Sequence, residues 1–185
     1  MGAGPEGVPA GVPAGVRDGF EGFDRLWTPH RMAYVAPATP AGDGCPFCAM
    51  EHLPPEESLV VATGKTCFTV LNLHPYNPGH LMVLPLRHVA DLEDLDEAEA
   101  AELMTTTQRA IRVLREVSGP HAFNVGLNLG GGAGGSLSQH LHQHVVPRWS
   151  GDANFITVVG GTKTLPQLLS DTRELLAQAW DGAGG

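Results

Sequence analysis

The sequence predicts an α+β fold in which an antiparallel sheet of about five strands is flanked by helices. Five short segments carry strand-like runs or alternations of apolar residues and are joined mostly by short connections that contain glycine, proline or asparagine. Two longer segments show the helical spacing of apolar residues and are separated from most of these strands. Strands and helices that are segregated along a chain in this way are typical of antiparallel α+β domains.

Length and composition predict one folded domain that follows a tail rich in glycine and proline. A chain of 185 residues with 42% hydrophobic residues is long enough to bury a single core. Residues 1–20 repeat the sequence VPAG and hold too little apolar bulk to fold, so we expect a disordered tail there. We expect the domain to span residues 21–181, and residues 182–185 to be flexible.

Five segments of that domain carry the pattern of β-strands. Apolar residues run through the first three and alternate with other residues in the last two, and the turn residues of HPYNPGH separate the second from the third. The expected strands cover residues 58–64, 66–73, 80–88, 122–130 and 138–147. A glycine-rich loop, GGGAGGS, separates the last two strands.

Two segments carry the spacing of an amphipathic helix. The first, 96–118, begins at Asp96, a favourable N-cap residue, and ends before Gly119. The residues expected on its buried face are Leu103, Thr107, Ile111 and Leu114. The second, about 166–180, carries four leucines and ends at Trp180.

Charge, hydropathy and cysteine content exclude several classes of function. The net charge of -9 argues against a general nucleic-acid binder, because a phosphate backbone requires a basic surface. The chain has no run of 18 or more apolar residues, so we expect no membrane span. Three cysteines do not form a disulfide framework, which favours a reduced, cytoplasmic setting.

The segment QHLHQHVVPRW at 139–149 places three histidines at alternate positions. In a strand, His140, His142 and His144 would point to the same face at intervals of about 7 Å. Such a cluster is costly to bury without partners, so chance composition explains it poorly. A metal site fits the pattern, and so does a catalytic site with one imidazole as nucleophile or base. The preceding glycine loop favours catalysis on a phosphate, because it lets backbone N–H groups approach an anion.

The HLHQHVVPRW segment resembles the alternating signature of the histidine-triad family of nucleotide hydrolases and transferases. Gln143 is a polar departure at a position that is normally apolar. The upstream segment FTVLNLHPYNPGHLMVLPLRHVADL is similar to the family's ribose-binding and histidine-bearing strands, and the similarity spans about residues 45–150. Within the family, LWTPHRMAYV, FNVGLNLG, AGGSL and GDANFI resemble the actinobacterial branch that cleaves diadenosine tetraphosphate with phosphate.

This resemblance implies a catalytic role for four histidines. His142 would attack the α-phosphorus of a nucleotide and form a nucleotidyl-histidine. His144 would contact the phosphate oxygens, and His80 would orient the triad. His140 would hold a metal ion. The implied substrate-binding residues are Asn72 for the ribose, Asn128 for the α-phosphate, and Gly134, Gly135, Ser136 and Trp149.

The resemblance also implies which group accepts the nucleotide. Ser136 stands where many hydrolytic members carry glutamine, and a small hydroxyl beside Gly134 and Gly135 leaves room for a second anion. Inorganic phosphate would then replace water, giving phosphorolysis of diadenosine tetraphosphate to ADP and ATP. Three alternative functions remain open. The chain could hydrolyse dinucleoside polyphosphates or nucleoside phosphoramidates, or it could be a zinc-stabilised nucleotide-binding protein with little turnover. It could also be a metalloenzyme that uses all three triad histidines. No organic cofactor is implied.

The pair Cys45 and Cys48 is by itself ambiguous between a zinc site, a redox site and chance. Many members of the family bind zinc through two cysteines and two histidines, and the matching positions here are Cys45, Cys48, His88 and His140. Four protein ligands leave no open coordination position, which implies a structural Zn²⁺. Members of the family usually join their sheets edge to edge, so the resemblance further implies a homodimer or a higher homo-oligomer.

Overall fold

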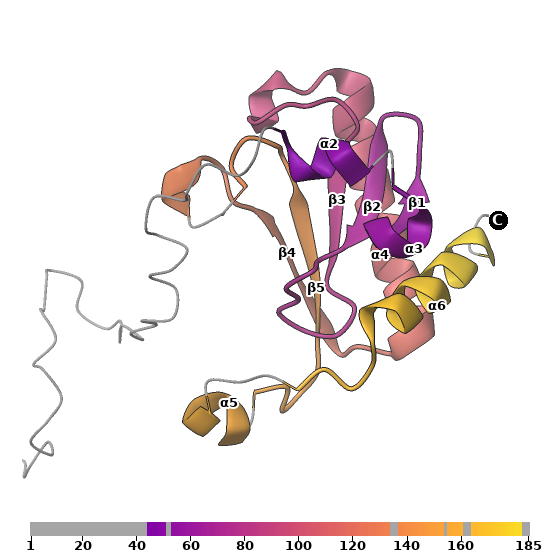
Figure 1. Cartoon of the computed structure of the whole chain (residues 1–185), viewed down its shortest axis with the longest axis vertical. Coiled ribbons are helices and arrows are strands. Elements are labelled where there is room, and N and C mark those ends of the chain that lie inside the picture. The colour runs from indigo at the N-terminus through magenta and orange to yellow at the C-terminus, as the bar shows by residue number, and fades with distance from the viewer. Residues whose placement is uncertain (1–43, 51–52, 134–136, 154, 161–163, 183–185) are drawn as a thin grey trace, which may run out of the picture.

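The computed structural model contains a five-stranded sheet with helices against both of its faces (Figure 1). It describes residues 44–50, 53–133, 137–153, 155–160 and 164–182. The expected tail at 1–20 and the first part of the expected domain, 21–43, lie outside these residues, as do residues 183–185.

The sheet confirms the predicted fold class. Its strands are β1 (Val60–Thr63), β2 (Cys67–Leu71), β3 (Leu81–Pro85), β4 (Ala122–Leu127) and β5 (Gln143–Arg148). Their order is β1-β2-β3-β5-β4, and every neighbouring pair is antiparallel. Because β5 lies between β3 and β4, the strand that follows the histidine motif runs through the interior of the sheet, and β4 forms an edge.

The central strands β2 and β3 are buried on both faces, which explains why their sequences are almost continuously apolar. Alternate side chains of these strands enter two separate clusters. One cluster packs against α4 and α6 and includes Leu71, Leu81, Val83 and Val145. The other packs against Phe47 and includes Phe68, Val70, Met82 and Leu84.

The longest helix forms as its sequence predicts. The helices are α2 (Pro46–Met50), α3 (Pro55–Ser58), α4 (Glu97–Ser118), α5 (Phe155–Gly160) and α6 (Leu169–Gly182), with 3-10 turns η2 (Leu92–Asp94) and η3 (Gly131–Ala133). The Asp96 side chain accepts a hydrogen bond from the Glu99 N–H at 2.8 Å, and the Glu99 side chain accepts one from the Asp96 N–H at 3.0 Å. This capping box fixes the start of α4. None of the helices in the described part of the chain has the length and apolar character needed to span a membrane.

The prediction of a strand over residues 138–147 is wrong for its first half. β5 begins only at Gln143, and the preceding residues form a turn. The Leu141 N–H bonds the Val89 carbonyl at 2.7 Å, which holds this segment against the loop after β3. His140 and His142 therefore lie in the segment that leads into β5, and only His144 lies in the strand.

Candidate active site

Two histidines from neighbouring strands form a hydrogen-bonded pair on the face of the sheet opposite α4. His80 directly precedes β3 and is fully buried. Its Nδ1 accepts the Tyr76 N–H at 3.1 Å, so in the neutral ring the proton is on Nε2. That Nε2 lies 2.9 Å from Nδ1 of His144 and donates to it. His144 consequently carries its own proton on Nε2. The Asn128 side-chain amide lies 3.3 Å from that nitrogen, and with this tautomer its Oδ1, exchanged with Nδ2 by a half-turn of the amide, accepts the Nε2–H.

Burial keeps both rings of this pair neutral. The pKa of His80 is lowered to about 3, chiefly by desolvation and to a smaller extent by the nearby His144 and His142. Desolvation also lowers the pKa of His144 to about 4, again with a contribution from His142. A neutral pair keeps a fixed direction of hydrogen bonds at neutral pH, from the Tyr76 N–H through His80 to His144. The site thereby presents the His144 Nε2–H as a donor.

The geometry of His142 is that of a nucleophile. Its Nδ1 lies 2.8 Å from the backbone carbonyl of His140, which only accepts, so Nδ1 carries the proton. The lone pair is then on Nε2. The ring packs 5.4 Å from Phe47 and 5.0 Å from the His144 ring, measured between centroids. A largely buried imidazole whose Nδ1–H is held by a carbonyl can attack an electrophilic phosphorus through the lone pair of Nε2.

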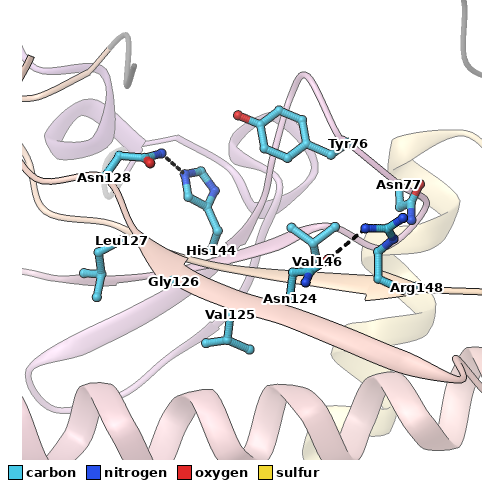
Figure 2. Close-up of a pocket in the computed structure, with 10 residues that line it drawn as sticks. All are labelled: Tyr76, Asn77, Asn124, Val125, Gly126, Leu127, Asn128, His144, Val146 and Arg148. Atoms are coloured by element: carbon cyan, nitrogen blue, oxygen red, sulfur yellow. Dashed lines mark hydrogen bonds between the residues drawn. The ribbon is translucent and has the colours of Figure 1, made fainter. Parts of the chain in front are cut away.

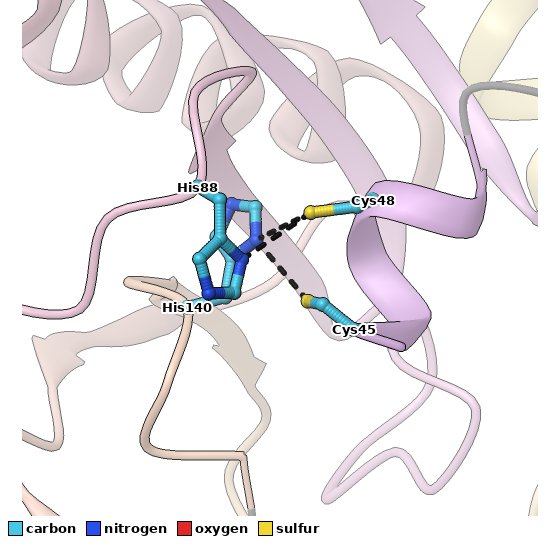
Figure 3. A group of neighbouring side chains, drawn as sticks. All are labelled: Cys45, Cys48, His88 and His140. Atoms are coloured by element: carbon cyan, nitrogen blue, oxygen red, sulfur yellow. Dashed lines mark hydrogen bonds between the residues drawn. The ribbon is translucent and has the colours of Figure 1, made fainter. Parts of the chain in front are cut away.

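Four side chains converge at the opposite end of the histidine segment and could hold a metal ion (Figure 3). Cys45 and Cys48 come from the start of α2, His88 from the loop after β3, and His140 from the segment before β5. The ligand atoms of the four lie within 4.8 Å of one another. Among the described residues, this group contains only one triad histidine, which contradicts a metalloenzyme that uses all three.

The distances in this group fit a tetrahedral zinc site. Zinc–sulfur bonds of about 2.3 Å and zinc–nitrogen bonds of about 2.0–2.1 Å place the two ligand types about 3.6 Å apart. The sulfur–nitrogen distances are 3.3 Å for Cys48 to His88, 3.4 Å for Cys45 to His140 and 3.6 Å for Cys48 to His140. The His140 Nε2 donates to the Pro85 carbonyl at 2.9 Å, which leaves Nδ1 unprotonated and directed at the cysteines.

Asn72 lies beside His80 and already has a local partner. Its Oδ1 accepts the His74 N–H at 2.9 Å, the bond of a turn-capping asparagine, and its amide lies 3.4 Å from the His80 Nδ1. Trp149 follows β5 and lies about 17 Å along the chain direction from His144, since a strand rises about 3.3 Å per residue. Gly134, Gly135 and Ser136 lie outside the described residues.

The turn before β3 is held in place by buried contacts. Asn77 is buried and donates to the Pro147 carbonyl at 2.8 Å and to Asp152 at 2.7 Å. Gly79 has φ +74°, and a Cβ there would lie 3.0 Å from Leu114 of α4. This close approach of the backbone to α4 fixes the position of the next residue, His80, relative to the sheet.

A pocket of about 370 Å³ lies beside His144, over β4 and β5 (Figure 2). The residues that line it are Tyr76, Asn77, Asn124, Val125, Gly126, Leu127, Asn128, His144, Val146 and Arg148. Of these ten lining residues, the sequence predicted only Asn128 and His144 as site residues. Tyr76 appeared only as part of a turn, although its ring packs 4.7 Å from His80 and 5.9 Å from His144.

Known proteins resemble this chain in sequence and in fold. The family model described as HIT domain matches residues 55–151. The AP-4-A phosphorylase of Mycobacterium tuberculosis is 61% identical over 163 residues, which cover 84% of each chain. The asymmetrical bis(5'-nucleosyl)-tetraphosphatase of Schizosaccharomyces pombe is 35% identical over 98 residues, 53% of each chain. A Zn-bound histidine triad family protein from Mycobacterium smegmatis superposes with a TM-score of 0.62 at 27% identity and covers 75% of this chain and 94% of its own.

Proposed function

The chain belongs to the HIT domain family, and from this membership we propose that it is an enzyme that cleaves diadenosine tetraphosphate with inorganic phosphate. The observation that carries the proposal is His142, whose Nδ1–H is held by the His140 carbonyl at 2.8 Å so that Nε2 is the unprotonated nitrogen. The high identity to a protein named AP-4-A phosphorylase supports the choice of substrate and acceptor.

The proposed reaction has two displacements at one phosphorus. His142 Nε2 attacks the α-phosphorus, a phosphorus–nitrogen bond forms, and the bond to the bridging oxygen breaks, so that ATP leaves. An oxygen of inorganic phosphate then attacks the same phosphorus, the phosphorus–nitrogen bond breaks, and ADP leaves. His142 returns with its Nε2 lone pair. The carbonyl of His140 stabilises the positive charge that the ring carries in the intermediate.

The contacts of His144, His80 and Asn128 support the roles proposed for them, and the family resemblance supports the roles proposed for the other residues. The Nε2–H of His144 donates to a phosphate oxygen, and His80 is a positioning residue because it fixes that tautomer. Asn128 binds the α-phosphate from the opposite side of His144. Asn72 binds the ribose. We assign Gly134, Gly135 and Ser136 to the incoming phosphate, and we keep Trp149 as a substrate-binding residue.

We propose that Cys45, Cys48, His88 and His140 bind a structural Zn²⁺. Zinc bound there would tie α2 and the loop after β3 to the nucleophile, because His140 offers its side chain to the metal and its carbonyl to His142. The thiolate ligands agree with a reduced, cytoplasmic setting. No step of the reaction requires the metal.

We also propose that the chain forms a homodimer or a higher homo-oligomer through β4. This strand lies at the edge of the sheet, and most of its residues are exposed. An edge strand offers unpaired backbone groups to a second copy. Light scattering on the purified protein tests this, and a monomer at all concentrations would contradict it.

Product analysis tests the function. The protein is incubated with diadenosine tetraphosphate with and without inorganic phosphate, and the nucleotides are separated. ADP and ATP that appear only with phosphate would establish a phosphorylase. Products that form equally without phosphate would make it a hydrolase. A His142→Ala variant that keeps nucleotide affinity but loses turnover would exclude a binding protein with little turnover.

A further inference from the structure

The pocket beside His144 extends well beyond the atoms that the proposed chemistry needs. We infer that it is the subsite for the leaving nucleotide, that is, for the phosphate groups and the nucleoside beyond the reacting α-phosphate. The inference rests on the proposed function. The pocket's volume of about 370 Å³ lies within the range of about 300–1,000 Å³ that is typical of small-molecule sites.

Strand order places the two ends of the substrate on opposite sides of His144. The proposed ribose ligand Asn72 follows β2, which is separated from β5 by β3. Neighbouring strands lie about 4.8 Å apart, so this nucleoside lies about 10 Å from β5. The pocket lies over β5 and β4, on the other side of His144. A dinucleotide whose phosphates cross the histidines would therefore place its second half in the pocket.

The direction of the proposed displacement also indicates that the leaving nucleotide enters this pocket. The pocket runs from His144 toward Val146 and Arg148 (Figure 2). Because His142 precedes β5 and these residues follow His144 within it, the pocket extends along β5 away from His142. In an in-line displacement at phosphorus, the leaving oxygen departs on the side opposite the nucleophile. A nucleotide that His142 displaces would thus move past the Nε2–H of His144 and into the pocket.

The lining of the pocket suits an anionic chain that ends in a nucleoside. None of its ten lining residues is aspartate or glutamate, in a chain whose net charge is -9. Arg148 is held by Asp152 through two bonds of 2.6 and 2.9 Å and donates to the Asn124 Oδ1 at 2.8 Å. That bond orients the Asn124 amide, so its nitrogen is the group left to donate to a ligand. Tyr76 is half exposed and offers a ring face to a base.

Gly126 gives a direct way to fill the pocket. It pairs with His144 in the β4–β5 ladder, and a Cβ on it would have no heavy atom within 4 Å. Its backbone does not have a positive φ, so a valine is compatible with the strand. Gly126→Val would therefore occupy the pocket without moving the histidines. Gly182→Val is the matched control, because it adds the same side chain into open space at the end of α6.

The test compares two substrates that share the reacting half. Diadenosine tetraphosphate has a large leaving nucleotide, whereas adenosine 5′-phosphoramidate loses only ammonia. We expect Gly126→Val to lower kcat/KM for the tetraphosphate about tenfold or more, while the value for the phosphoramidate stays within about twofold. Gly182→Val should change neither value. Thermal unfolding of each variant checks that the fold is retained.

Equal losses on the two substrates, or no loss on either, would overturn the inference. Wild-type protein that does not cleave diadenosine tetraphosphate would overturn the proposed function together with the inference, and that result is distinct from the first two. If Gly126→Val does not fold, Asn124→Asp gives the same comparison. It keeps the acceptor for Arg148 and places a negative charge in the pocket, so it should again weaken the reaction of the tetraphosphate selectively.

Discussion

Replacement of His80 by leucine tests whether a buried hydrogen-bond chain sets the tautomer of His144. Leucine has nearly the volume of histidine but neither ring nitrogen. The variant removes the acceptor of the Tyr76 N–H and the donor to the His144 Nδ1. His144 can then place its proton on either nitrogen, and its Nδ1 lone pair is open to protonation.

Two energies follow from these contacts. Each buried group that loses its partner destabilises the folded state by about 1–2 kcal/mol, and the added apolar surface offsets part of this. We therefore expect the free energy of unfolding to fall by about 1–3 kcal/mol. One positioned donor contributes about 3–4 kcal/mol to a transition state. Because the ring of His144 remains and only its tautomer is released, we expect kcat to fall about 10–100-fold.

Three measurements check this prediction. Ring nitrogen NMR should show His144 protonated at Nε2 in the wild type and in mixed tautomers in the variant. The pKa of His144, about 4 in the wild type, should rise, because an N–H donor no longer occupies its lone pair. Steady-state kinetics with diadenosine tetraphosphate should show the fall in kcat. His74→Leu, an exposed histidine of the same turn, is the control. A variant with unchanged kcat and an unchanged His144 tautomer would refute the reasoning.

Three further perturbations test the metal-binding group and the fold. Cys45→Ser should abolish stoichiometric zinc binding and lower Tm by about 4–8 °C, which corresponds to a loss of about 2 kcal/mol in the free energy of unfolding. Turnover should persist at temperatures below the lowered Tm. Loss of turnover with an unchanged Tm would contradict a structural metal. Gly79→Ala should cost about 2–3 kcal/mol in urea denaturation, because φ is +74° and the new Cβ would lie 3.0 Å from Leu114; an unchanged midpoint would disprove this. The hydrogen bond from the Arg87 side chain lowers the pKa of Glu99 to about 2. The ionised Glu99 therefore stabilises the folded protein fully above pH 4.5, and this stabilisation is lost as the pH falls toward 2. The free energy of unfolding of Glu99→Gln should therefore differ less between pH 7 and pH 3 than that of the wild type. The same difference in both proteins would count against this prediction.

Features that depend on neighbouring residues could be predicted from the sequence. The start of α4 at Asp96 and its end before Gly119 follow from capping chemistry within a few residues. The continuous apolar runs of β2 and β3 indicate strands that are covered on both faces. The short helices α2, α3 and α5 were not predicted, because one or two turns are too short to display a helical period.

The alternation of the three histidines suggested a regular strand, and the structure corrects this. The Leu141 N–H is bonded to the Val89 carbonyl, a partner 52 positions earlier that no local pattern contains. That contact keeps His140 and His142 out of the sheet ladder. It lets the side chain of His140 reach the cysteines of α2 while its carbonyl holds His142.

The sequence by itself determined the fold class, the long helix, the presence of the strands and the family signature, because each depends on periodicity and residue type over a few consecutive positions. Only the tertiary structure decided the tautomers of the triad histidines and His80, the convergence of four possible metal ligands from three segments, and the pocket over β4 and β5. These features depend on distances between residues far apart in the chain, such as Cys45 and His140. Packing of the sheet against α2 and α4 sets those distances, and no local pattern encodes them.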